Sequence, residues 1–199
     1  MTITLIDSPV ANVANIERAL RTTGADVRLT RDAAVVRDAR KIVLPGVGSF
    51  IAAMRWLEQT RIDDALRDAV SRGATLLGIC VGHQALFESS SEMGTTRGLG
   101  LLTGHVRMLE GPLPVPQIGW NRVDVQRSVL FDGIENGTPF YFVHSYAATH
   151  VDSEIGRAHY GGPFTAAAQD GRVFGLQFHP EKSSVAGLRV LRNFVELRT

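Results

Sequence analysis

The single cysteine of the chain lies in a segment whose glycine spacing is typical of a reactive nucleophile. Residues 78–82 read Gly-Ile-Cys-Val-Gly, with an apolar run before Cys80 and a helical pattern after it. In a nucleophile elbow, glycines two positions before and after the reactive residue let the strand and the helix approach each other. The positive end of the following helix favours the thiolate, which is the reactive form of cysteine. This spacing predicts that Cys80 is a nucleophile, with a buried and inert thiol as the alternative.

A cysteine nucleophile needs a histidine that takes up and returns protons, and a third group that orients this histidine. Among the six histidines, His179 stands at the end of the apolar segment 173–178 and is followed by Pro180 and Glu181. Residues just beyond the carboxyl ends of parallel strands face the crevice in which open α/β sheets bind ligands. The sequence therefore predicts that His179 and Glu181 complete a catalytic triad with Cys80.

A loop with two glycines contains candidate groups for stabilising negative charge. Residues 45–49 read Pro-Gly-Val-Gly-Ser and follow an apolar segment. Because Gly46 and Gly48 lack side chains, backbone N–H groups of this loop can turn toward the oxyanion of a tetrahedral intermediate. Taken alone, the loop is typical of an ordinary strand-to-helix turn, and only its combination with Cys80 favours an oxyanion hole. The glycine spacing does not match a dinucleotide fingerprint, and one cysteine with scattered histidines predicts no metal site.

Composition and charge narrow the classes of function. The chain has 199 residues, of which 44% are hydrophobic and 21% charged, and its formal net charge is +1. This is an ordinary composition for a folded domain, and a charge so close to zero does not favour nucleic acid or membrane partners. No segment approaches the roughly 18 consecutive apolar residues of a membrane helix, and the first residues lack the pattern of a signal peptide. We therefore expect a soluble, cytoplasmic protein.

The elements that must position these residues alternate along the first half of the chain. Apolar, β-branched runs predict strands at 2–6, 26–30, 41–44 and 74–79, and apolar residues at helical spacing predict helices over 13–20, 50–57, 62–70 and 81–89. In the second half, short strands are expected at 101–102, 105–108, 121–125, 140–144, 164–168 and 172–178, before a final helix capped by Ser183 or Ser184. The predicted fold class is α/β: one domain over 1–199, with a mostly parallel central sheet, helices on both faces and extra antiparallel strands in the C-terminal half.

Three segments, in order, resemble the hallmark motifs of class I glutamine amidotransferases. They are residues 45–50 (Pro-Gly-Val-Gly-Ser-Phe), 78–84 (Gly-Ile-Cys-Val-Gly-His-Gln) and 175–181 (Gly-Leu-Gln-Phe-His-Pro-Glu). Within this family, the chain resembles the glutaminase subunits of imidazole glycerol phosphate synthase at residues 115–121 (Val-Pro-Gln-Ile-Gly-Trp-Asn), 141–146 (Tyr-Phe-Val-His-Ser-Tyr) and 181–183 (Glu-Lys-Ser). The resemblance covers essentially the whole chain and implies a flavodoxin-like fold.

The resemblance also implies a reaction. Cys80 would attack the side-chain amide of glutamine, His179 would move protons, and Glu181 would orient His179. The backbone amides of Val47 and Val81 would form the oxyanion hole, the former in many relatives only after its peptide turns over. The glutamine-binding positions implied by the motifs are Gly46, Gly48, Gln84, Glu92, Ser145 and Tyr146. The resemblance implies no cofactor and no metal.

The narrower resemblance implies a protein partner. Ammonia would pass through a buried channel to a separate cyclase subunit, and the two subunits would form a heterodimer that acts in histidine biosynthesis. The residues expected at the interface are Asn12, Gln117, Trp120, Asn121 and Lys182.

Two segments depart from the family pattern. Residues 7–12 read Asp-Ser-Pro-Val-Ala-Asn in place of Asp-Tyr-Gly-x-Gly-Asn, in a loop that lies toward the partner in relatives. Val81 and His83 replace leucine and methionine beside Cys80. We expect His83 to be solvated or hydrogen-bonded rather than to perturb the ionisation of Cys80.

Three other functions remain open at this point. The chain could be the glutaminase subunit of a synthase with another ammonia acceptor, such as a sugar or a different heterocycle. It could be a cysteine peptidase or hydrolase with the same elbow, although such an enzyme has no need for the pair of Gln84 and Glu92. It could also be a regulatory subunit without catalysis, which the presence of all three triad residues disfavours.

Overall fold

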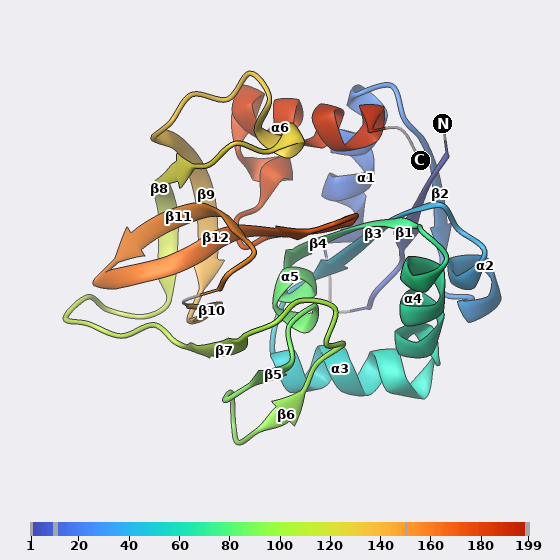
Figure 1. Cartoon of the computed structure of the whole chain (residues 1–199), viewed down its shortest axis with the longest axis horizontal. Coiled ribbons are helices and arrows are strands. Elements are labelled where there is room, and N and C mark those ends of the chain that lie inside the picture. Colours follow the sequence, from blue (N-terminus) through green and yellow to red (C-terminus); the bar gives the residue numbers. More distant parts are fainter. Residues whose placement is uncertain (1, 10–11, 150, 198–199) are drawn as a thin grey trace.

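The computed structural model describes residues 2–9, 12–149 and 151–197, and its main layer is a mixed nine-stranded sheet (Figure 1). In spatial order the strands are β2 (Asp26–Thr30), β1 (Thr2–Ile6), β3 (Lys41–Gly46), β4 (Thr75–Cys80), β13 (Val173–Leu176), β12 (Gly162–Asp170), β11 (Glu154–Tyr160), β8 (Gln117–Val125) and β9 (Thr138–His144). Neighbouring strands from β2 to β13 are parallel, and those from β13 to β9 are antiparallel. The predicted α/β fold is confirmed, and the antiparallel strands continue the same sheet.

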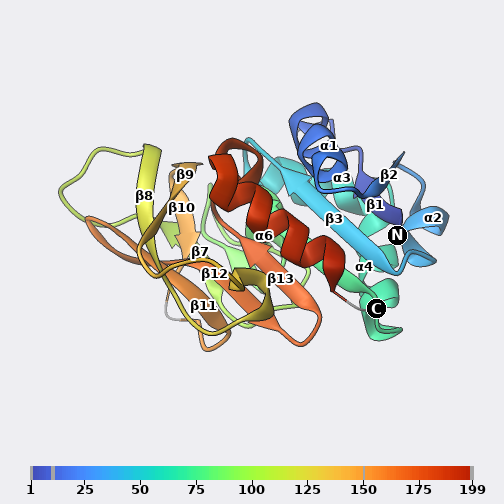
Figure 2. The same cartoon turned by 90° about the horizontal axis from the view of Figure 1, so that it is seen from above.

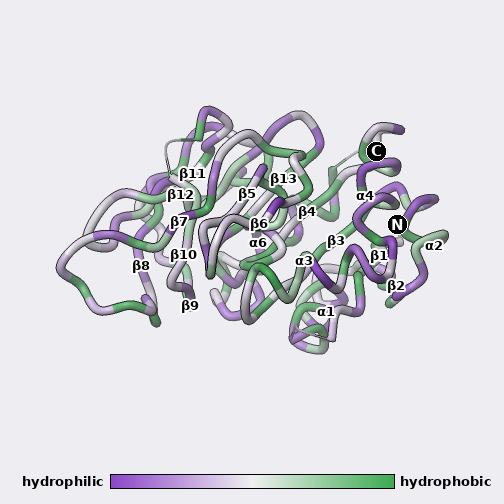
Figure 3. The backbone as a smooth tube through the Cα atoms, turned by 90° about the horizontal axis from the view of Figure 1, so that it is seen from below, coloured by the Kyte–Doolittle hydropathy of each residue, from purple (hydrophilic) through white to green (hydrophobic). Residues whose placement is uncertain are grey.

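Helices cover both faces of the parallel part. On one face lie α1 (Val13–Thr22) and α6 (Ser184–Glu196), and on the other lie α2 (Ala33–Arg37), α3 (Phe50–Gln59), α4 (Ile62–Ser71) and α5 (Val81–Ala85) (Figures 1 and 2). Successive residues of a strand point to opposite faces, so Val43 packs in the core with α1 and α6, while Ile42 and Leu44 pack in the core with α3 and α4. This double burial explains why the central strands β3 and β4 are apolar after their first residues, Lys41 and Thr75 (Figure 3).

A smaller sheet lies beside the antiparallel part. Its strands, in spatial order, are β10 (Tyr146–Ala148), β7 (His105–Met108), β5 (Ser89–Ser90) and β6 (Thr96–Arg97). Because β10 follows β9 after Ser145 alone, the chain passes from the large sheet to the small one at that residue. Two 3-10 turns, η1 (Val129–Phe131) and η2 (Pro180–Lys182), complete the elements, and η2 carries part of the predicted triad.

One expected helix is shorter than predicted, and one expected strand is absent from the described residues. The helix predicted over 81–89 ends at Ala85, because the chain beyond it forms backbone hydrogen bonds with the segment 98–102. Leu99 N donates to Ala85 O at 2.8 Å and Leu101 N donates to Leu86 O at 2.8 Å. These bonds also explain why residues 101–102 form no strand. The prediction also missed α2, β5, β6, β10 and β11.

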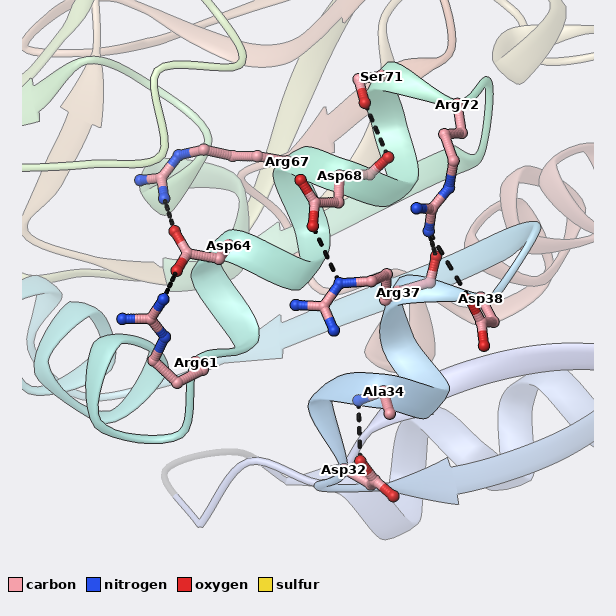
Figure 4. A network of polar contacts seen from close by, with 10 residues as sticks. All are labelled: Asp32, Ala34, Arg37, Asp38, Arg61, Asp64, Arg67, Asp68, Ser71 and Arg72. Carbon is pink, nitrogen blue, oxygen red and sulfur yellow. Dashed lines mark hydrogen bonds and ion pairs between the residues drawn. The ribbon is translucent and has the colours of Figure 1, made fainter.

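Charged side chains occupy two different settings in the helical layers. Exposed ion pairs join and flank α2 and α4, including Arg37 with Asp68 and Arg61 with Asp64 (Figure 4). Lys41, in contrast, is 1% exposed, and its ammonium group donates to the backbone carbonyls at the C-terminal end of α6, namely those of Phe194, Val195 and Leu197. No helix among the described residues is long and apolar enough to cross a membrane.

Candidate active site

Cys80 occupies the strained turn between β4 and α5 that the glycine spacing predicts. Its φ of 56° and ψ of −112° are rare for a residue with a side chain. The flanking glycines are required by space: a Cβ on Gly78 would lie 2.6 Å from Gly82 O, and one on Gly82 would lie 2.0 Å from Leu44 O. Strand and helix therefore touch backbone to backbone, and this contact holds the thiol at the carboxyl end of the sheet.

The parallel register brings the other predicted loops to the same edge. Gly46 pairs with Cys80 in the ladder between β3 and β4, so strand β3 continues through Pro45, where the sequence predicted a stop. The loop with Val47 and Gly48 follows directly beside the nucleophile. Leu176 pairs with Ile79, so β13 ends next to β4, and His179 lies just beyond that end.

His179 and Glu181 form a buried pair. His179 Nδ1 lies 2.8 Å from Glu181 Oε1, and the two side chains are 6% and 1% exposed. The backbone of His179 is held as well, because its N–H donates to Tyr141 O and its carbonyl accepts from Ser183 Oγ. Ser183 Oγ in turn accepts from Tyr141 N, which ties η2 to β9. Ser183 precedes α6 as predicted, but its hydroxyl forms no cap on that helix.

The surroundings of His179 favour its protonated form. Burial lowers the pKa of this imidazole, but hydrogen bonds to Cys80 and Glu181 and the negative charges of both groups outweigh burial and raise the pKa to about 10. The site therefore holds a protonated imidazole between Cys80 and Glu181. This arrangement suits a cysteine nucleophile paired with a histidine that a carboxylate orients.

A cavity of about 330 Å³ opens over Cys80. Nine of the predicted catalytic and glutamine-binding residues line it: Val47, Gly48, Cys80, Val81, Gln84, Glu92, Ser145, Tyr146 and His179. The remaining two, Gly46 and Glu181, lie behind this wall, the first within β3 and the second behind His179. Pro116, Val143, His144 and Lys182 also line the cavity.

Hydrogen bonds hold the polar wall of the cavity in place. Gln84 Nε2 donates to Tyr146 O at 2.7 Å and to Gln177 Oε1 at 3.0 Å. Glu92 accepts from Phe50 N, at the first residue of α3. Sequence reasoning did not single out Gln177, although it lies in the motif 175–181 and its Nε2 is 4.0 Å from Cys80 Sγ.

Four of the five expected interface residues are wholly or partly accessible. Asn12 and Lys182 are exposed, and Trp120 is 55% exposed. The ring of Trp120 lies 6.1 Å from that of Tyr141, and Lys182 Nζ lies 5.6 Å from the Tyr141 ring. Asn121 is half-buried, and its Nδ2 donates to His159 O. Residues 10 and 11 of the altered loop lie outside the described residues.

Two residues lie deeper in the interior than the sequence suggested. Gln117 is 3% exposed and contacts His144 at 2.9 Å, so its side chain faces the interior and not the surface. His83 is fully buried and therefore not solvated, and the backbone of Thr165 is the only hydrogen-bonding group that acts on the pKa of its ring among the described residues. It packs edge-on against Phe87, and burial lowers its pKa to about 3. The strands packed around it exclude water, which sequence spacing did not reveal.

Comparison with known proteins gives consistent results. The family model "Glutamine amidotransferase class-I" matches residues 4–197. The chain is 45% identical over 198 residues to "Imidazole glycerol phosphate synthase subunit HisH" of Moorella thermoacetica, which covers 98% of this chain and 94% of the relative. Identity to the protein of the same name from Herpetosiphon aurantiacus is 46% over 197 residues, with the same two shares.

Solved structures with low sequence identity share the fold. A crystal structure of a glutamine amidotransferase aligns with a TM-score of 0.76 at 18% identity, over 98% of this chain and 97% of the other. The structure of PurLQS from Thermotoga maritima aligns with a TM-score of 0.77 at 20% identity, over the same shares. The family match over nearly the whole chain, together with this fold, shows that the chain belongs to the class I glutamine amidotransferase family and, within it, groups with imidazole glycerol phosphate synthase subunits HisH.

Proposed function

We propose that the chain is the glutaminase subunit of an imidazole glycerol phosphate synthase. It hydrolyses glutamine to glutamate and ammonia, and a cyclase subunit uses the ammonia to form imidazole glycerol phosphate and an aminoimidazole carboxamide ribotide in histidine biosynthesis. The observation that carries this proposal is one cavity that joins Cys80 and His179 to Gln84 and Glu92, in a chain 45% identical to such a subunit. The proposal treats residues 1–199 as one amidotransferase domain acting in the cytoplasm, where a lone catalytic thiol stays reduced.

In the first half of the reaction, Cys80 Sγ attacks the side-chain amide carbon of glutamine. The C–S bond forms as the carbonyl electron pair moves to oxygen, and the backbone N–H groups of Val47 and Val81 stabilise the resulting oxyanion. The C–N bond then breaks, and His179 donates its proton to the leaving nitrogen. Its raised pKa, about 10, keeps this proton in place at neutral pH until the nitrogen departs. Ammonia and a thioester on Cys80 result.

In the second half, water hydrolyses the thioester. His179, now neutral, takes a proton from water while the oxygen attacks the acyl carbon. The C–S bond breaks, glutamate leaves, and the thiolate–imidazolium pair is restored. Glu181 holds His179 Nδ1 at 2.8 Å throughout, so that Nε2 faces the reacting atoms in both steps.

The polar wall of the cavity suits the amino-acid end of glutamine. Both N–H bonds of the Gln84 carboxamide are used within the protein, which leaves its oxygen for the α-ammonium group together with the carboxylate of Glu92. The backbone at Ser145 and Tyr146 provides N–H groups for the α-carboxylate. This assignment separates the charged end of the substrate from the amide at Cys80.

The accessible face beside the cavity suits a protein partner. Trp120 and Ile118 are 55% and 64% exposed on β8, and Lys182 lies between this face and the cavity. Exposed aromatic and apolar groups of this kind anchor protein interfaces. In the proposal, Asn12, Trp120, Asn121 and Lys182 contact the cyclase subunit, and ammonia leaves the cavity toward it.

The decisive experiment measures glutamate release from glutamine by the purified chain, alone and with a cyclase subunit carrying its nucleotide ligand. We expect weak activity alone and a large rise in the complex, because the liganded partner stabilises the active oxyanion arrangement. No rise with this cyclase would contradict the assigned partner and favour another ammonia acceptor. Full activity of the isolated chain would contradict the coupling.

The nucleophile is tested in the same assay. Cys80→Ala should abolish glutamate release, because no other group at this position can form the thioester. Binding of the cyclase subunit should be unchanged, since Cys80 is buried away from the accessible face. His159→Ala serves as a control, because the His159 side chain is exposed and does not line the cavity. Turnover by Cys80→Ala would refute the assignment.

A further inference from the structure

His144 stands where the large sheet ends and the cavity wall begins. Its side chain is buried against the ring of Phe164, with the ring centroids 4.9 Å apart, and it lines the cavity over Cys80. Each ring nitrogen faces an oxygen: Nδ1 lies 3.0 Å from Tyr146 O, and Nε2 lies 2.9 Å from Gln117 Oε1. The antiparallel register of β8 and β9 pairs Gln117 with His144, which explains why the two side chains meet.

The two partners determine which ring nitrogen carries the proton. A backbone carbonyl only accepts, so Nδ1 must donate to Tyr146. Burial lowers the pKa of His144 to about 4, and the hydrogen bond to Tyr146 offsets only part of this effect, so the ring is neutral at pH 7. Nε2 is then an acceptor, and the Gln117 carboxamide must turn its N–H₂ group toward it. The nearly equal shapes of the two ends of a carboxamide allow this orientation.

The carbonyl of Tyr146 is thereby held from two sides. It accepts from His144 Nδ1 at 3.0 Å and from Gln84 Nε2 at 2.7 Å. These hydrogen bonds restrain the connection between β9 and β10, where Ser145 and Tyr146 line the cavity. Leu109 N also donates to Ser145 O, and β10 pairs with β7, but Gln84 is the other side chain that donates to the Tyr146 carbonyl, and Gln84 also bonds to Gln177.

We propose that His144, held in its Nδ1–H tautomer by the Tyr146 carbonyl with Gln117 as a donor to Nε2, is a positioning residue that orients the backbone of Ser145 and Tyr146 for the α-carboxylate of glutamine. The inference rests on the proposed glutaminase function, in which this backbone binds that carboxylate. It also assigns a role to Gln117, which is too deeply buried to contact a partner directly.

A kinetic comparison separates this role from a merely structural one. In the complex with liganded cyclase, His144→Phe should raise KM for glutamine about tenfold with kcat within about twofold, the effect of losing one hydrogen bond that orients a binding group. His144→Asn, whose side-chain N–H can replace Nδ1–H, should restore most of the affinity. With 4-aminobutanamide, which is glutamine without its α-carboxylate, His144→Phe should lower kcat/KM by less than about twofold. Equal losses on both substrates, or an unchanged KM for glutamine, would overturn the proposal.

Nitrogen NMR of the histidine side chains tests the tautomer independently of activity. The His144 signals are identified by their absence in His144→Phe, and they should show a protonated Nδ1 and a bare Nε2. Gln117→Glu replaces the donor by an acceptor, so the ring should become doubly protonated, whereas Gln117→Leu should leave Nδ1–H in place. An Nε2–H tautomer in the unmodified chain would overturn the proposal. If the unmodified complex releases no glutamate, the proposed function fails by itself, and the tautomer remains measurable.

Discussion

Acidic and basic side chains pair at similar distances in two contrasting regions of this molecule. On α2 and α4, Arg37 Nε lies 2.9 Å from Asp68 Oδ2, and the two side chains are 38% and 52% exposed (Figure 4). In the candidate active site, His179 Nδ1 lies 2.8 Å from Glu181 Oε1, and the side chains are 6% and 1% exposed. Distance therefore does not distinguish the two pairs, whereas exposure does.

The difference in exposure changes what each pair contributes. Water and salt screen the pairs on α2 and α4, so each adds little to stability. The contact between His179 and Glu181 is buried, and there the same kind of contact shifts the pKa of the imidazole strongly and fixes its orientation. The comparison predicts large effects on activity at the buried pair and small effects on stability at the exposed one.

The largest effect is expected at the buried pair. Glu181→Gln keeps the size of the side chain but removes its charge, so His179 loses both its orienting acceptor and the stabilisation of its protonated form. We expect kcat for glutamine hydrolysis in the complex to fall by about 10³- to 10⁴-fold, as when a triad carboxylate is neutralised. Asp68→Asn is the matched exposed control and should leave kcat unchanged. A loss below about tenfold for Glu181→Gln would contradict the triad role.

The same substitution should lower the pKa of His179. Its protonated form is favoured by Cys80 and Glu181 against the opposing effect of burial, so removing either partner moves the pKa down from about 10. NMR titration of the histidine side chains should show this shift in Glu181→Gln and in Cys80→Ala. The exposed His105 provides the control, and its titration should not change. A pKa of His179 that is the same in all three proteins would contradict the origin of the shift.

A buried cation outside the site should affect stability rather than activity. Lys41→Met removes the ammonium group that donates to three carbonyls at the end of α6. We expect the free energy of unfolding to fall by about 2 kcal/mol, because buried carbonyls lose their donor. Denaturant titration measures this change, with Arg40→Met at the neighbouring exposed position as the control. Equal stability of the two variants would show that the buried contacts contribute nothing.

The smallest effect is expected on the exposed pairs. Asp68→Ala breaks the contact with Arg37 in solvent. The free energy of unfolding should fall by no more than about 0.5 kcal/mol, and the difference should shrink as salt is added. A loss above about 1.5 kcal/mol at high salt would remove the contrast between the two regions.

Much of the catalytic wall was predictable because its determinants are local. The spacing of Gly78, Cys80 and Gly82 requires a tight strand-to-helix turn wherever it occurs, and the structure contains that turn. The placement of His179 after an apolar strand predicted its position at the carboxyl edge of the sheet, since parallel strands end together. The helix predicted over 81–89 was too long, because its last turn gave way to hydrogen bonds with residues 98–102, a contact between distant segments.

The sequence by itself determined the family, the α/β alternation and the identity of the reactive groups, because motif spacing and hydrophobic period are properties of neighbouring residues. Only the tertiary structure decided which side chains are excluded from water. The fold buries Gln117 against His144. It also buries His83 against Gly175, and a Cβ added to Gly175 would lie 1.9 Å from His83 Nδ1. Burial depends on strands that are far apart in the chain and adjacent in the sheet. For that reason the protonation states of His83, His144 and His179 follow from the fold and not from the motifs that contain them.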